Sequence, residues 1–275
     1  MNCPACGSAA LRPFVRFRFR LRTRTWTPRA VECTACSHRF LPTTEGEQRE
    51  IEAGYGGGYS GFRADPVFDA VIRREVRERL LPAVPRGSRL LDVGCGNGVI
   101  LCAATEEGYA ARGVDVSEES ARLCRERGLD ARAGDFLTMP LDGPYDAVTF
   151  WDVMEHLREP AAFLERAREV LKPGGALVLK IPGFGRGTFR PIALLPRLAG
   201  VMLGAPSHVQ YFNHRSLEAL LARTGFGGVE WFPSFAFRSP PRKRNPLRQL
   251  AVNTIRWMGR VGGTGNLYLL ARRTG

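Results

Sequence analysis

The hydrophobic pattern is clearest near residue 90, where a short, largely apolar run ends in an acid that three glycines follow. The run covers residues 88–91, and Asp92 ends it. The glycines are Gly94, Gly96 and Gly98, and a helix-like stretch covers residues 99–107. A buried strand followed by a glycine-rich turn and a helix is how a doubly wound α/β sheet presents bare backbone to a nucleotide-like ligand. Glycine is needed there because only a residue without Cβ lets the main chain turn sharply and touch the ligand.

Further apolar runs predict the remaining strands of such a sheet. Residues 113–117 are expected to end a second strand and contain an acid, Asp115. Residues 145–151 form an apolar-rich run that is expected to be a further strand. Residues 171–179 contain the end of a helix, a Lys-Pro-Gly-Gly turn and another strand. Residues 266–272 are expected to form the last strand. The chain therefore predicts one α/β domain, which its length of 275 residues accommodates together with a small second module.

The spacing of the glycines indicates which class of nucleotide-like ligand the turn binds. A dinucleotide fingerprint of the form Gly-x-Gly-x-x-Gly that begins at Gly94 would put its third glycine at position 99, where this chain has Val99. The alternate spacing suits a ligand without a pyrophosphate. Together with Ala133-Gly134-Asp135-Phe136 and the Lys172-Pro173-Gly174-Gly175 turn, the segment resembles the motifs of class I S-adenosylmethionine-dependent methyltransferases. The resemblance covers roughly residues 65–272.

The resemblance implies a Rossmann-like seven-stranded sheet with helices on both faces, and a set of cofactor contacts. Asp115 follows Asp92 by 23 residues, near the interval of about 20 at which a carboxylate meets ribose hydroxyls. The resemblance also implies that Asp135 takes the adenine amino group and that Phe136 packs on the ring. The implied cofactor-binding residues are Asp92, Gly94, Gly96, Gly98, Asp115, Val116, Asp135, Phe136 and Trp151.

The methyl acceptor is expected beyond the strand at 145–151. In a helix beginning near 152, Asp152, Glu155 and His156 would share one face. The Glu-His-Leu stretch and the residues after it resemble the quinone-biosynthesis O-methyltransferases. That resemblance implies His156 as the general base, with Asp152 and Glu155 orienting it or helping to bind Mg²⁺. The alternative is a capping box formed by Asp152 and Glu155, which has no catalytic role.

A second group of candidates lies in residues 186–214, which we interpret as an insertion that builds the acceptor pocket. Relatives often carry a histidine and an aromatic residue here, so His208 is a candidate substrate contact and the fourth catalytic candidate. His214 is expected to be structural. The following helix is predicted to begin with Ser216 as its cap and to end at Gly225.

Four cysteines near the N-terminus form two Cys-x-x-Cys pairs. The pairs are Cys3 with Cys6, and Cys33 with Cys36. Four thiolates suit a structural zinc ion, and the alternating residues 14–21 suit a hairpin between the pairs, so residues 1–42 predict a zinc ribbon. A redox dithiol or a vestigial site without metal is the alternative. With four cysteines available, His38 is expected on the surface rather than as a ligand.

The residues after the ribbon predict a joint. Residues 43–64 contain a glycine-rich stretch with Tyr55 and Tyr59, which form either a plain linker or a lid over the cofactor or the substrate. The methyltransferase domain is then expected to cover residues 65–275, including the acceptor-site insertion at 186–214.

The net charge of +13 is concentrated at the two ends of the chain. Residues 1–40 carry +7 and residues 233–275 carry +9, while the span between them carries −3. Basic ends favour polyanionic partners such as RNA or an anionic membrane surface, which the amphipathic residues 242–260 would contact peripherally. A solvated arginine-rich surface is the alternative. The chain has no apolar run of membrane-spanning length and no secretory signal, so a cytoplasmic protein is expected.

Three classes of function remain. The first is S-adenosylmethionine-dependent O-methylation of a small hydroxylated acceptor. The second is methylation of a ribosomal RNA base, with the ribbon and the basic ends holding RNA; however, no Asn-Pro-Pro-Tyr tetrad follows the strand at 145–151. The third is a non-enzymatic scaffold, which the intact set of Asp92, the glycines, Asp115 and Asp135 argues against. Nothing in the pattern predicts the oligomeric state.

Overall fold

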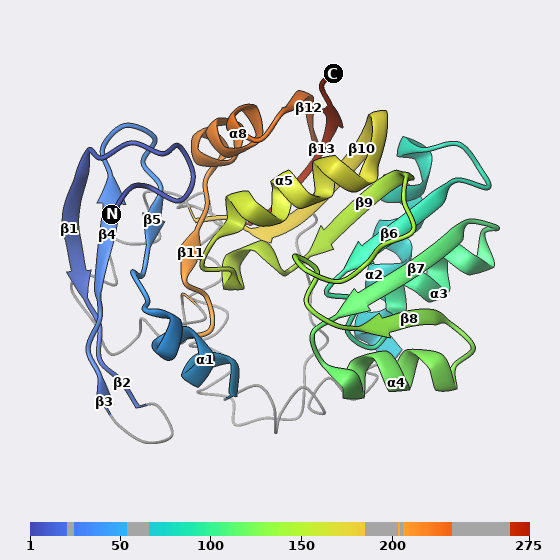
Figure 1. Cartoon of the computed structure of the whole chain (residues 1–275), viewed down its shortest axis with the longest axis horizontal. Helices are drawn as coiled ribbons and strands as arrows, with labels where there is room; N and C mark the ends of the chain where they lie inside the picture. The colour runs from blue at the N-terminus through green and yellow to red at the C-terminus, as the bar shows by residue number, and fades with distance from the viewer. Residues whose placement is uncertain (21–24, 54–65, 185–202, 204–205, 233–264) are drawn as a thin grey trace.

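A seven-stranded sheet and a four-stranded sheet, with a two-stranded hairpin beside the latter, organise the described part of the chain (Figure 1). The structure is a computed structural model of the whole chain. It describes all residues except 21–24, 54–65, 185–202, 204–205 and 233–264. The larger sheet lies in the C-terminal part and the smaller one in the N-terminal part, as two differently built modules.

The large sheet has the strand order β12-β13-β10-β9-β6-β7-β8. Its strands are β6 (Arg89–Val93), β7 (Ala110–Asp115), β8 (Asp130–Ala133), β9 (Tyr145–Trp151), β10 (Leu171–Pro182), β12 (Phe226–Phe232) and β13 (Asn266–Arg273). Strands β8, β7, β6, β9 and β10 are mutually parallel, and β13 is antiparallel to both β10 and β12. This arrangement confirms the expected seven-stranded methyltransferase sheet.

Helices cover both faces of this sheet because its central strands are apolar on both sides. The helices are α2 (Pro66–Glu75) with its continuation η2 (Val76–Leu80) and η3 (Leu81–Ala83), α3 (Val99–Glu106), α4 (Glu118–Glu126), η4 (Met154–His156), α5 (Pro160–Val170) and α8 (His214–Arg223). In β10, Leu177 and Leu179 join the core cluster that contains Leu164 of α5. Val178 joins the other cluster, with Val76 of η2. Alternate side chains of one strand therefore hold helices on opposite faces.

The small sheet takes its fourth strand from a distant part of the chain. Its order is β1-β4-β5-β11, where β1 (Leu11–Arg16), β4 (Arg29–Cys33) and β5 (Arg39–Phe40) come from the N-terminal module. Strand β11 (Gln210–Tyr211) pairs antiparallel with β5. The hairpin β2 (Phe19–Arg20) and β3 (Thr25–Trp26) and the helix α1 (Glu45–Ala53) complete this module. Figure 1 shows β11 running beside β5.

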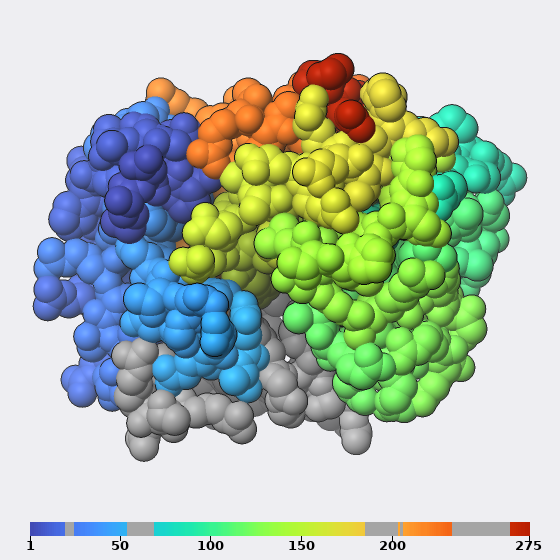
Figure 2. Space-filling model, in the orientation of Figure 1, coloured from blue at the N-terminus to red at the C-terminus, as the bar shows by residue number. Residues whose placement is uncertain are grey.

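A third apolar cluster seals the joint between the two modules. Phe17 and Trp26 of the N-terminal module are buried together with Ile51 of α1 and with Val209 and Tyr211 around β11. Arg223 of α8 also donates a hydrogen bond to the carbonyl of Pro4, and Figure 2 shows the dark-blue N-terminal atoms against the orange atoms of α8. The N-terminal module is thus packed on the large domain.

Several sequence predictions fall on residues outside the described part. These are the candidate lid tyrosines Tyr55 and Tyr59, most of the insertion at 186–214 and the basic amphipathic segment 242–260. Among the helices that the structure does describe, none has the length and apolar character to cross a membrane.

The start of α8 differs from the prediction. Asn213, not Ser216, is the N-cap: its side chain accepts a hydrogen bond from the Ser216 amide, and the Ser216 hydroxyl accepts one from the Asn213 amide. This reciprocal pair is a capping box in which Ser216 is the third residue of the helix. The predicted cap was wrong by three residues because both residue types serve equally well as caps.

Candidate active site and metal centre

The glycine turn lies at the carboxyl end of β6 and adopts a conformation that other residues rarely reach. Gly94, Gly96 and Gly98 have φ values of 75°, 51° and 76°. A Cβ at position 94 would lie 2.5 Å from Cγ2 of Val153, so the chain after β9 packs directly on the turn. A Cβ at position 96 would have no atom within 4 Å. The turn therefore combines a close contact on one side with open space on another.

Asp115, at the end of β7, ties the glycine turn to the neighbouring strand. Its carboxylate accepts hydrogen bonds from the amides of Gly96 and Ser117, each at 2.9 Å. Burial raises the pKa of this carboxyl, while the two amide hydrogen bonds act in the opposite direction. Val116, the next residue, is 84% exposed. The two residues thus place a fixed acid and an apolar side chain at the edge of the turn.

Asp92 is the least satisfied polar residue near the turn. Its side chain is fully buried, and among the described residues neither carboxylate oxygen has a hydrogen-bond partner. Burial raises the pKa of this carboxyl well above its usual value, and the nearby Cys124 and Asp115 add to the effect. A buried carboxylate without partners is costly. These oxygens fit a ligand that brings hydrogen-bond donors, and S-adenosylmethionine carries both hydroxyl and amino donors.

The other predicted cofactor residues lie on neighbouring strands with different surroundings. Asp135 follows β8 and is exposed, and its carboxylate accepts a hydrogen bond from the Leu137 amide. Phe136 is buried, with its ring 5.8 Å from those of Phe150 and of Phe163.

Trp151 ends β9 as a buried residue. Its ring packs edge to face on Tyr268 at 5.9 Å. Its indole nitrogen has no hydrogen-bond partner among the described residues. Trp151 therefore offers an unused donor next to the acid that follows it.

The chain does not form the predicted helix from residue 152. Asp152 has a φ of 55°, its amide donates to the carbonyl of Lys180 at 2.8 Å, and its carboxylate forms an ion pair with the Lys180 ammonium group. Only one helical turn follows, η4, and its N-cap Val153 makes no side-chain hydrogen bond. Both the shared helical face and the alternative capping box are therefore wrong, because the left-handed residue interrupts the helix and Lys180 engages the acid.

The structure instead brings Glu155, His156 and His208 together. The Nε2 atom of His156 lies 3.8 Å from Oε1 of Glu155, and the Nε2 atom of His208 lies 4.0 Å from the same oxygen. The two imidazole rings are 4.8 Å apart and nearly perpendicular. Glu155 is fully buried, and its two oxygens have no hydrogen-bond partner in the described structure. The two histidines and one acid thus converge on a single point.

The electrostatics of this group favour uncharged side chains. Burial raises the pKa of Glu155 well above its usual value, with a further contribution from Asp152. Burial lowers the pKa of His156, and it lowers that of His208 to about 3 with help from His156. The Nδ1 atom of His156 lies 3.0 Å from the Ser207 carbonyl. Because a carbonyl only accepts, Nδ1 carries the proton and Nε2 is the unprotonated nitrogen of the neutral ring.

The spacing of the three atoms discriminates between two occupants. Gaps of 3.8 and 4.0 Å are too long for direct hydrogen bonds. An oxygen about 2.8 Å from each atom fits them with an angle of about 90°. A metal ion about 2.1 Å from each atom would need angles of about 130–145°, far from tetrahedral or octahedral values. These three side chains are close enough to form a candidate metal-binding group, but their spacing suits a hydroxyl or water oxygen better than a cation.

The four N-terminal cysteines form a second cluster. The Sγ atoms of Cys3 and Cys36 are 3.7 Å apart, and those of Cys6 and Cys33 are 3.6 Å apart. All four sulfurs lie within 4.8 Å of one another without a disulfide. A tetrahedral zinc with Zn–S bonds of about 2.3 Å requires sulfur–sulfur distances of about 3.8 Å. The arrangement therefore fits a structural zinc.

His38 is not on the surface, contrary to the prediction. It is fully buried, and its Nε2 atom lies 2.8 Å from Oε1 of Gln210. Its ring lies 5.8 Å from that of Phe40 and 4.7 Å from that of Phe212. The prediction failed because Gln210 and Phe212 are distant in the sequence, so nothing near residue 38 indicated that they cover it.

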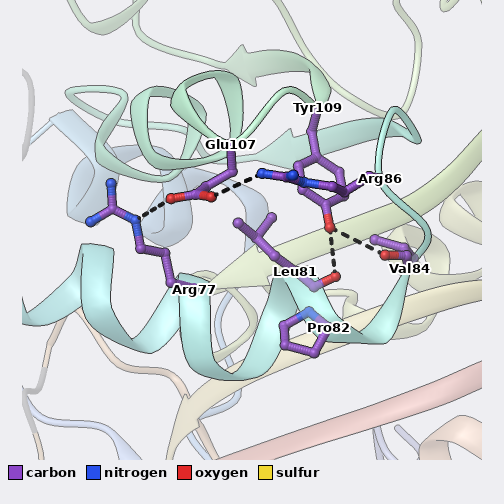
Figure 3. Close-up of a pocket in the computed structure, with 7 residues that line it drawn as sticks. All are labelled: Arg77, Leu81, Pro82, Val84, Arg86, Glu107 and Tyr109. Carbon is purple, nitrogen blue, oxygen red and sulfur yellow. Dashed lines mark hydrogen bonds and ion pairs between the residues drawn. The ribbon is translucent and has the colours of Figure 1, made fainter.

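A surface pocket of about 540 Å³ lies at the opposite end of the large sheet (Figure 3). Its lining residues are Arg77, Leu81, Pro82, Val84, Arg86, Glu107 and Tyr109. The hydroxyl of Tyr109 donates to the Leu81 carbonyl at 2.9 Å, and Arg77 pairs with Glu107. These residues precede β6 and β7, whereas the glycine turn follows β6. The pocket is therefore separate from the candidate active site.

Two residues of the candidate site were not identified from the sequence. Lys180 is only 6% exposed near the end of the apolar run 176–181 of β10, and it pairs with Asp152. A lone lysine inside an apolar run was the available signal, since a buried ammonium group needs a partner. Gln210 had no such signal, because its partners are residues that only the fold brings near it.

Comparison with known proteins agrees with this architecture. Residues 68–230 match the model of the family described as "Methyltransferase domain". Because the match covers more than half of the chain, the protein belongs to this family and is an S-adenosylmethionine-dependent methyltransferase. The glycine turn with its buried and strand-ending acids lies inside the matched region.

Three individual proteins illustrate what the chain is similar to. The ubiquinone biosynthesis O-methyltransferase of Bordetella bronchiseptica is 33% identical over 168 residues, which are 54% of this chain and 67% of the relative. A phosphoethanolamine N-methyltransferase of Haemonchus contortus in complex with S-adenosyl-L-methionine has a TM-score of 0.56 at 19% identity, over 74% of this chain and 52% of that one. The 1,6-didemethyltoxoflavin-N1-methyltransferase of Burkholderia thailandensis has a TM-score of 0.57 at 16% identity, over 94% and 100%. The two structures share the fold, and the sequence relative is a small-molecule O-methyltransferase.

Proposed function

We propose that the protein transfers the methyl group of S-adenosylmethionine to a hydroxyl oxygen of a small acceptor. The observation that carries this proposal is the convergence of Glu155, His156 and His208, in which the Nε2 atoms of both histidines lie 3.8 and 4.0 Å from one Glu155 oxygen. The similarity to a ubiquinone biosynthesis O-methyltransferase supports the same type of acceptor.

The residues that would hold the cofactor surround the glycine turn. The Asp92 carboxyl group offers unpartnered oxygens, Gly96 leaves open space, and the Asp115 carboxylate beside Gly96 would meet the ribose hydroxyls. Bound S-adenosylmethionine supplies an electrophilic methyl group. Because Val153 packs on Gly94 and is followed two residues later by Glu155, the acceptor-side residues begin beside the cofactor turn. This proximity is what an in-line methyl transfer requires.

His156 would act as the general base. Its Nδ1–H donates to the Ser207 carbonyl, so Nε2 receives the hydroxyl proton as the oxygen–methyl bond forms and the sulfur–methyl bond breaks. The positive charge that develops on His156 would favour the ionised form of Glu155, whose carboxylate would then stabilise the imidazolium. His208, on the other side of the same carboxyl group, would orient the hydroxyl, and the ion pair of Asp152 with Lys180 would fix the entry to η4.

A divalent cation at this site is less compatible with the geometry. The Mg²⁺ set expected from the sequence was Asp152, Glu155 and His156, but Asp152 is engaged by Lys180. With bonds of about 2.1 Å, the distances between the remaining ligand atoms would also require ligand–metal–ligand angles of about 130–145°. The proposed mechanism therefore uses no cation.

RNA is the second candidate acceptor, and one observation favours it. Arg12, Arg16, Arg18 and Arg29 are exposed on and beside strands β1 and β4, where a polyanion would meet several positive charges. Arg12 is paired with Glu32, which reduces the charge available. Because no base-methylating tetrad follows β9, we rank RNA below the small acceptor.

One experiment tests both candidates. The purified protein is incubated with labelled S-adenosylmethionine and either a panel of phenols and catechols or total RNA. We expect label in the phenolic fraction, and label confined to RNA would reject the O-methylation proposal. His156→Ala should lower the rate about 10²–10⁴-fold, with unchanged affinity for S-adenosylhomocysteine. His214→Ala is the matched control, because His214 packs on Trp231 instead.

A further inference from the structure

The side chain of Gln210 connects the cysteine module to the candidate active site. Gln210 is 2% exposed, and its Oε1 atom lies 2.8 Å from Nε2 of His38, two residues after the ligand-type Cys36. Its amide nitrogen donates to the carbonyl of Leu157 at 2.9 Å, one residue after His156. One buried amide thus contacts both modules and uses its acceptor and its donor in doing so.

The backbone of Val209, the residue before Gln210, also connects the cysteine module to the candidate active site. The amide of Val209 donates to the Glu155 carbonyl at 2.8 Å, and the Val209 carbonyl accepts from Leu41 at 2.8 Å. Gln48 of α1 donates to the His156 carbonyl at 3.0 Å. The N-terminal module therefore touches the backbone of both Glu155 and His156, and Figure 2 shows α1 in light blue against the yellow-green surface.

His208 is fixed from the same side. It directly precedes Val209, and its carbonyl accepts a hydrogen bond from the Tyr211 hydroxyl at 2.8 Å. Tyr211 is itself paired with Arg39 in the β5–β11 register. Since β5 begins three residues after Cys36, the cysteine cluster, the small sheet and His208 form one continuous packed unit.

We propose that Gln210 is a positioning residue: through His38 it uses the four-cysteine module to hold the His156–His208 pair at the methyl acceptor. This inference rests on the proposed function of that pair. The module then serves the active site directly, in addition to any binding surface that its arginines provide. A contact that merely docks the two modules, such as that of Arg223 with Pro4, lies on an exposed surface and bears no such relation to the histidines.

The test uses the ring signals of the histidines in the full-length, zinc-supplied protein. The chain has four histidines, so their imidazole signals in a histidine-labelled sample are assignable by single substitutions. Gln210→Met keeps the side-chain volume and removes the side-chain hydrogen bonds to His38, Leu157 and Arg158. We expect the His156 and His208 signals to move and the His214 signal to stay, because His214 packs on Trp231 at another location.

Hydrogen exchange and catalysis provide two further readouts. Amide exchange in residues 154–158 and 207–212 should become about 10-fold faster in Gln210→Met, since the hydrogen bonds of the Gln210 side chain are lost. Methylation of the phenol that takes most label should fall by a similar factor, while zinc content and affinity for S-adenosylhomocysteine stay unchanged. Arg223→Ala, the matched docking control, should leave all of these readouts unchanged.

Unchanged His156 and His208 signals together with unchanged local exchange would overturn the proposal, as would equal effects of Arg223→Ala. If Gln210→Met fails to fold, His38→Phe makes the same test, because phenylalanine keeps the ring contacts and loses the hydrogen bond. If both variants fold, their effects on exchange should be less than additive, since each removes the same bridge. The signals and the exchange rates need no acceptor, so a failure of the O-methylation proposal is recognised separately.

Discussion

Gly94 and Val153 are in direct contact: a Cβ added to Gly94 would lie 2.5 Å from the Cγ2 atom of Val153. Gly94 belongs to the turn after β6, and Val153 belongs to the segment after β9 that leads to Glu155. The absence of one side chain thus lets the cofactor turn and the acceptor-side segment pack on each other. Their packing couples the two halves of the proposed reaction site.

Gly94→Ala should therefore damage both stability and cofactor binding. The left-handed φ of 75° and the collision with Val153 together predict a loss of about 2–4 kcal/mol in the free energy of unfolding. Affinity for S-adenosylhomocysteine, measured by calorimetry, should fall at least about 10-fold. Gly108→Ala is the control, because it has a φ of 83° and no atom within 4 Å of its Cβ. Equal effects of the two variants on affinity would contradict this prediction.

Asp92→Asn should stabilise the unliganded protein while weakening cofactor binding. Burial raises the pKa of the Asp92 carboxyl, and Asp115 and Cys124 face it. A raised folded-state pKa gives stability that is complete below the unfolded-state value and is lost as the pH rises through the folded-state value. The variant should thus melt at a higher temperature than the wild type at pH 8, with a smaller difference at pH 5. Unchanged affinity for S-adenosylhomocysteine would remove Asp92 from the cofactor site.

The sheet was predictable because its signals are local. The run that ends in Asp92, the alternate glycines and the acid at 115 each depend on neighbours in the sequence, and they specify β6, the turn and β7. The four cysteines were also predictable, since their spacing alone requires two knuckles. Hydrophobic periodicity and metal-ligand spacing can both be recognised in the sequence without knowledge of the fold.

The acceptor side was only partly predictable because its decisive contacts are long-range. Glu155, His156 and His208 were identified as candidates, but the pairing of Asp152 with Lys180 breaks the helix on which the shared face was based. The proximity of His208 to His156 and the burial of His38 both depend on β11 joining β5. No pattern in a two-residue strand indicates such a pairing.

The stability contributed by His208 should depend on pH. Burial lowers its pKa to about 3, and His156, Glu155 and Lys180 are the titratable groups around it. Because the unfolded state binds the proton more readily, the wild type should lose stability relative to His208→Gln as the pH falls from about 6.5 towards 3. Melting temperatures of both proteins at pH 7.5, 6 and 5 measure this difference. A difference that is constant with pH would show that His208 is solvated in the folded protein.

Removal of the metal should affect the active site as well as the cysteine module. Cys33→Ser replaces one of four converging thiols, and a module of this size has too little core to fold without its metal. We expect metal analysis to give about one zinc per wild-type chain and much less in the variant. Exchange should quicken first in β4 and β5 and then in β11, because β5 and β11 are paired. Cys102→Ser is the control, since Cys102 lies on α3, outside the cluster. Wild-type protein without zinc, or rapid exchange confined to residues 1–42, would contradict a metal that supports the acceptor site.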